Sequence, residues 1–133
     1  MDLMKYMLLM QSNKRGWDDM AKTWSPEDVR VMVEYMRVLN RELQEAGELL
    51  EVRGLSGPDE MKTLRTQDDG EPIITDGPFS ETKEVLAGYW VVDVASEERA
   101  FEIAARVSRT PGPGGRPLNQ AVEIHPAGVE PAP

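Results

Sequence analysis

The sequence predicts an α+β fold, a split βαβ arrangement in which an antiparallel sheet carries two helices on one face. The first observation is the order of the apolar segments, which runs strand, helix, a group of strands, helix and strand, without an internal repeat or a domain linker. The second is that both helices have clear start signals. The third is that two strands are apolar on both faces, so both faces of the sheet must be covered.

The opening strand, from Tyr6 to Met10, is apolar in both of its alternating sets of residues. It is too short for a signal-peptide core and lacks a small-residue cleavage site. The following segment, residues 12–24, mixes glycine and polar residues with hydrophobic anchors and predicts a long loop. Within it, Trp17 either lines a pocket or simply packs, whereas Trp24 is expected to pack against Val29 ahead of the first helix.

The first helix is predicted to start after Ser25 and to end at Gly47. Ser25 can cap it and Pro26 suits its first turn, while its apolar residues recur at three- and four-residue spacing. Its methionines are interpreted as core filler. A second helix begins after Ser96, with two glutamates in its first turn and a stripe of small and branched apolar residues that allows close packing on a sheet.

Strands are expected between the two helices and after the second one. The Asp68-Asp69-Gly70 tripeptide indicates a hairpin between two of them. The chain has no further helix to cover the second face of the sheet, so a second copy of the chain is the simplest cover and a homodimer is expected. The expected strands are residues 49–55, 61–66, 73–75, 88–94 and 121–125.

Composition limits the classes of function. The chain has 133 residues, which fits one domain, expected over residues 1–125 with a disordered tail at 126–133. A formal net charge of −9 disfavours direct binding to nucleic acid. No apolar run is long enough to cross a membrane. With no cysteine and His125 as the single histidine, we expect no metal site and no cofactor.

Residues 76–84 crowd turn formers, an aromatic residue and several ionisable groups into one stretch. Gly77 and Pro78 predict a sharp turn, in which Asp76 would accept hydrogen bonds from downstream amides and Ser80 would cap a short helical turn. The alternative is a rigid turn with no chemistry and a solvated charged face. The candidate catalytic residues are Asp76 as a base, Glu81 as a second acid and Lys83 as an anion contact; the candidate ligand-binding residues are Trp17, Phe79 and Tyr89.

The stretch Asp76-Gly77-Pro78-Phe79, together with the apolar segment 88–94 and the opening strand, resembles the DGPF-domain proteins of the YCII-related family. The resemblance spans nearly the whole chain. It implies a ferredoxin-like fold of the dimeric α/β-barrel type, a cytoplasmic bacterial protein and association with extracytoplasmic-function sigma factors. His125 departs from the arginine more often found before Pro126 in the family, which argues against a shared catalytic role at that position.

Two functions remain open from the sequence, beside a catalytically silent member that keeps only the fold. One is a small-molecule-binding or catalytic cleft near Asp76, with the ligand held between the sheet, the Trp17 segment and the turn. The other is a non-catalytic module that regulates a sigma factor or another protein through its acidic surface. The resemblance supplies no reaction and no substrate.

Overall fold

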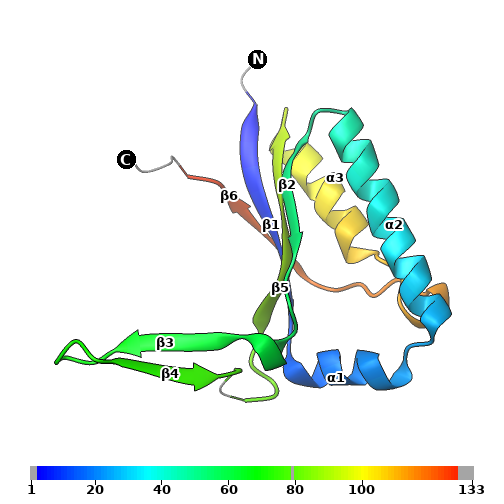
Figure 1. Ribbon diagram of the computed structural model, residues 1–133. Coiled ribbons are helices and arrows are strands. Elements are labelled where there is room, and N and C mark those ends of the chain that lie inside the picture. The colour runs from blue at the N-terminus through cyan, green and yellow to red at the C-terminus, as the bar shows by residue number, and fades with distance from the viewer. Residues whose placement is uncertain (1–2, 79, 129–133) are drawn as a thin grey trace.

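The computed structural model describes residues 3–78 and 80–128 and has an antiparallel sheet, a separate hairpin and three α-helices (Figure 1). The four strands of the sheet lie in the order β2-β5-β1-β6, with every neighbouring pair antiparallel. The strands are β1 (Met4–Ser12), β2 (Leu49–Gly54), β5 (Val85–Val94) and β6 (Val122–Pro126); the hairpin is β3 (Lys62–Thr66) with β4 (Pro72–Asp76).

The hydrophobic core lies between this sheet and two helices, α2 (Pro26–Glu45) and α3 (Glu97–Ser108), which cover the same face (Figure 1). Alternate residues of the central strand β5 are buried, as expected when one face of a strand packs on helices. Trp90 donates its indole N–H to Asn40 of α2 at 2.8 Å, which satisfies the one polar atom of this large core side chain. The core residues are Tyr6, Leu8, Leu39, Leu43, Trp90, Val92, Val94, Ala100, Ile103, Ala104 and Val107.

The predicted starts of both long helices are confirmed. At α2, Ser25 and Asp28 form a reciprocal capping box, with Ser25 Oγ accepting from the Asp28 amide and Asp28 Oδ2 accepting from the Ser25 amide, both at 3.0 Å. Asp28 Oδ1 also accepts from the Gly114 amide at 3.1 Å. At α3, Ser96 Oγ accepts from the Arg99 amide at 3.1 Å.

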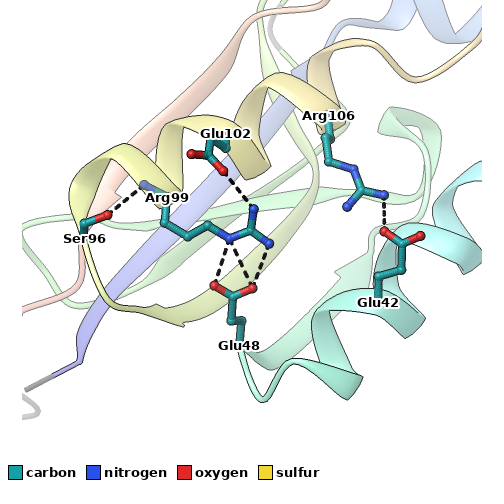
Figure 2. Close-up of polar contacts among 6 residues, drawn as sticks. All are labelled: Glu42, Glu48, Ser96, Arg99, Glu102 and Arg106. Carbon is teal, nitrogen blue, oxygen red and sulfur yellow. Dashed lines mark hydrogen bonds and ion pairs between the residues drawn. The ribbon is translucent and has the colours of Figure 1, made fainter. Parts of the chain in front are cut away.

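Arg99 joins α3 to the junction between α2 and β2 (Figure 2). Its guanidinium donates from Nε and Nη2 to the Glu48 carboxylate at 2.9–3.2 Å and from Nη1 to Glu102 at 3.0 Å. The hydrogen bonds to Glu48 are the main reason that the pKa of Arg99 is raised above its ordinary value. Two turns further along α3, Arg106 pairs with Glu42 of α2 at 2.6 Å.

The expectation of a loop over residues 12–24, and hence of two helices only, was wrong. A third helix, α1 (Lys14–Thr23), crosses the foot of the sheet towards the start of α2 (Figure 1). Asn13 caps it by accepting from the Gly16 amide at 2.8 Å. Its hydrophobic residues Trp17 and Met20 are three apart, and Trp24 follows four later, a helical spacing that the polar composition of the segment obscured.

The hairpin predicted at residues 68–70 is present, and β3 and β4 extend away from the main sheet (Figure 1). The turn residues explain its geometry: Gly70 is the last residue of the turn and Asp69 Oδ1 accepts from the Glu71 amide at 2.9 Å. The residues of both hairpin strands are exposed, including Leu64 at 59% and Ile74 at 58%.

The end of the described chain is more ordered than the sequence indicated. Pro126, assigned to the tail, is the last residue of β6, and the Ala127 amide donates to Lys5 O at 2.9 Å. The rest of the expected tail, from residue 129 onward, lies outside the described residues. No helix in the described part of the chain is long and apolar enough to span a membrane.

Candidate functional site

An apolar hollow that borders the core lies at the foot of the sheet, between α1, α2 and the ends of β1, β2 and β5. It has a volume of about 450 Å³, which is within the range of small-molecule sites. Two tryptophans and four methionines form most of its wall, and Ser12, Asp19 and Gln120 add polar groups. We refer to it as the tryptophan–methionine cavity, after Trp17, Trp24, Met10, Met20, Met32 and Met36.

Helix α1 positions the cavity's floor. Trp17 and Met20 lie on one side of this short helix, and Trp24 ends it by donating its backbone N–H to Met20 O at 3.1 Å. None of these side chains is fully buried, although all three are large and apolar. Partly buried aromatic and methionine side chains around a hollow are typical of adaptable apolar binding surfaces.

A second support for Trp17 comes from the short 3₁₀ turn η1 (Pro58–Glu60). A Cβ placed on Gly57, at the start of this turn, would lie 2.5 Å from Trp17 Nε1. Only glycine therefore allows the backbone to lie flat against the indole. Lys14 reinforces the contact between α1 and η1, since its Nζ donates to Asp59 at 2.9 Å as well as to Asp18 at 3.1 Å.

Asp76 lies at the end of β4, outside the lining of this cavity. Its side chain is 81% exposed and pairs with Lys62, its cross-strand neighbour, at 2.5 Å. The hydrogen bond from Lys62 holds the Asp76 pKa below its usual value. In the described residues no backbone amide donates to the Asp76 carboxylate, so the predicted Asx-type bonding is replaced by a salt bridge.

The turn after Asp76 has the predicted shape but not the predicted helix. Gly77 has φ of +67° and donates its amide to Met61 O at 2.8 Å, which ties the turn to the start of β3. Residues 80–84 form an exposed turn rather than a helical one, with the Lys83 amide donating to Ser80 O. No side-chain hydrogen bond or salt bridge within the described residues joins Glu81 or Lys83 to Asp76, whose partner is Lys62.

The candidate ligand-binding residues have separate places. Trp17 is in the wall of the cavity. Tyr89 is on the face of β5 opposite the core, next to Arg53 of β2, and partial desolvation followed by the Glu51 carboxylate raises the pKa of its phenol. Phe79 lies outside the described residues. His125 is exposed on β6 and its Nε2 is 3.1 Å from Glu123 Oε1.

Sequence reasoning missed most of the cavity. It assigned Trp24 to packing on Val29 and the methionines of α2 to the core. Met36 does pack against the core, but Trp24, Met32 and Met36 also line the cavity. The spacing of Trp17, Met20 and Trp24 was the available signal for α1. Across the described ranges, no three histidine, aspartate or glutamate side chains come together in a way that could hold a metal ion.

Comparison with known proteins gives two matches. The family model described as "YCII-related domain" matches residues 4–112. An uncharacterized protein of Rhizobium meliloti (strain 1021) is 32% identical over 109 residues, which cover 82% of this chain and 83% of that protein. The matched range includes every element from β1 to α3, and thus most of the residues that form the tryptophan–methionine cavity.

Proposed function

The chain belongs to the YCII-related domain family, and we propose that it binds a compact, mainly apolar small molecule in the tryptophan–methionine cavity. The carrying observation is a hollow of about 450 Å³ with two tryptophan and four methionine side chains in its wall. Exposing apolar surface to water costs free energy in proportion to its area. A ligand of matching shape would bury this surface and so bind favourably.

The location of the cavity supports a binding role over a packing defect. Its wall combines two helices, the three strands β1, β2 and β5 and the segment that carries Leu118, so several parts of the chain contribute to one concave surface. Polar groups are few: Ser12, Asp19 and Gln120 can orient a ligand while the remainder holds its apolar body. The proposed binding site is therefore beside Trp17, rather than at the Asp76 turn where the sequence predicted a cleft.

The three tryptophans allow a direct test, because two line the cavity and the third does not. We expect phenethyl alcohol, an uncharged aromatic probe, to shift the indole N–H signals of Trp17 and Trp24 in a titration followed by ¹H–¹⁵N NMR. The Trp90 indole, which is in the core and bonded to Asn40, serves as an internal control and should stay in place. Equal or absent shifts at all three indoles at millimolar probe would refute the proposal.

A pair of substitutions adds a second test. Ala87 lines the cavity, so Ala87→Met fills part of it and should weaken probe binding. Ala21→Met makes the same chemical change on an exposed position of α1 that does not line the cavity, and should leave binding unchanged. If both variants bind as the parent protein does, the probe is held elsewhere.

We further propose that two copies associate through the sheet face opposite the core, as a ferredoxin-like dimeric α/β barrel would. The strand order β2-β5-β1-β6, with both long helices on one face, supports this architecture. The open face carries Met7, Leu9, Tyr89 and Val91 at its centre, all only partly buried in the single chain. Sedimentation at micromolar concentration should give a dimer, and a stable monomer would refute it.

A further inference from the structure

A second hollow adjoins the tryptophan–methionine cavity. Its volume is about 310 Å³ and it lies where β1 ends and the chain approaches β6. The two hollows share the wall residues Ser12, Gly16 and Gln120, so they lie side by side across these residues. Glu84 and Glu123 contribute carboxylates to the second hollow, which we call the acidic hollow.

Every ionisable side chain that lines either hollow in the described structure is a carboxylate. Asp19 borders the apolar cavity, while Glu84 and Glu123 border the acidic hollow. None of the three forms a salt bridge with a lysine or arginine of the described residues; Glu123 contacts only the imidazole of His125. In the described residues, the carboxylates around the two neighbouring hollows therefore have no lysine or arginine salt-bridge partner.

The neutral polar groups of the acidic hollow also suit a ligand that donates hydrogen bonds. Gln11 and Gln120 line it with side chains whose amide oxygens can accept a hydrogen bond, whereas the Asn13 Oδ1 already accepts from the Gly16 amide. The Gln120 amide nitrogen already donates to Gln11 O, which directs the nitrogen of this amide to the backbone. An ammonium group has three donors and no acceptor, so carboxylates and amide oxygens match it.

From this arrangement we propose that the ligand is an organic amine whose apolar body occupies the tryptophan–methionine cavity and whose ammonium group enters the acidic hollow. The inference rests on the proposed function, since it assumes that the cavity binds a small molecule. The faces of the Trp17 and Trp24 indole rings can also attract a cation through cation–π interactions. A carboxylate in the same place would face the like charges of Glu84 and Glu123 and should bind more weakly.

Three probes of one shape separate the two proposals: phenethylamine, phenethyl alcohol and phenylacetate carry a cation, a neutral hydroxyl and an anion on the same aromatic body. We expect the amine to bind about three- to tenfold more tightly than the alcohol, because each partly exposed ion pair adds a modest energy. The anion should bind most weakly. Raising the salt concentration should reduce the preference, because the charges are near solvent.

The outcomes are distinct. If the alcohol binds at Trp17 and Trp24 and the amine binds no more tightly, the cavity is a binding site but the amine assignment is wrong. If the anion binds best, the assignment is also wrong. If no probe shifts those indoles, the proposed function fails and the inference with it.

The carboxylates provide a matched pair of variants. The double substitution Glu84→Gln and Glu123→Gln should reduce the affinity for phenethylamine to that for phenethyl alcohol and leave the alcohol's affinity unchanged. The control, Glu81→Gln with Glu98→Gln, removes the same two charges from exposed positions that line neither hollow. An equal loss of amine affinity in both double variants would show that overall charge, rather than the acidic hollow, sets the preference.

Discussion

The indole of Trp17 lies against the backbone of Gly57 so closely that a Cβ at position 57 would be 2.5 Å from its Nε1. This contact couples η1 to α1, and through α1 to the floor of the tryptophan–methionine cavity. It is the place where a very small change in sequence should disturb the candidate site without removing any of its side chains.

Gly57→Ala should therefore displace Trp17. We expect a loss of about 1–3 kcal/mol in the free energy of unfolding, as for other overpacked contacts, and a changed tryptophan emission spectrum. The control is Gly54→Ala, since a Cβ at Gly54 meets no atom within 4 Å. Equal denaturant midpoints for Gly57→Ala and the parent protein would mean that Trp17 can move aside without cost.

The capping box of α2 makes part of the stability depend on pH. The amides of Ser25 and Gly114, in that order, lower the pKa of Asp28 below its usual 3.8. A lowered carboxylate pKa stabilises the fold above pH 3.8, and this contribution is lost as the pH falls through the folded-state pKa. The stability difference between the parent and Asp28→Asn should thus shrink on acidification, as measured by urea unfolding. A difference of constant size from neutral pH to below 3.8 would contradict it.

Arg99 tests how much the polar contacts of Figure 2 hold the helices in place. Its side chain is 32% exposed and that of Glu48 is 16% exposed, so Arg99→Met leaves a largely buried carboxylate without its partner. We expect a loss of about 2 kcal/mol, the range for hydrogen bonds to charged groups. Arg37→Met removes an exposed pair with Glu34 and should cost less than about 0.5 kcal/mol. Similar losses for both variants would contradict the difference in burial.

Asp76 distinguishes the cavity from the turn as the site. Because its carboxylate is exposed, pairs with Lys62 and does not line the cavity, Asp76→Asn should leave both the stability and the affinity for phenethyl alcohol nearly unchanged. Trp17→Ala, which removes part of the wall, should abolish the response of the Trp24 indole in the same titration. If Asp76→Asn abolished binding in a folded protein, the turn would have to be part of the site after all.

Local signals in the sequence determined much of the fold. Ser25, Pro26 and Asp28 fix where α2 begins because they satisfy its first amides within a few residues of the chain. The Asp68-Asp69-Gly70 turn and the alternation of β5 likewise depend on neighbouring residues, and both elements were predicted. The resemblance to the YCII-related family, carried by the Asp76-Gly77-Pro78-Phe79 stretch, was confirmed by the family match.

The candidate site was decided by tertiary structure. Trp17 and Met20 of α1, Met36 of α2 and Leu118 near the end of the described chain are distant in sequence, and only packing against the sheet makes them walls of one cavity. Conversely, Asp76, Glu81 and Lys83 are close in sequence, but within the described residues Asp76 forms its salt bridge with Lys62, across the base of the hairpin, rather than with Lys83. Local sequence determines where helices are capped and where turns form, because those hydrogen bonds join residues that are close in the chain. The shape of a cavity depends instead on how separate elements pack against each other, which no single segment specifies.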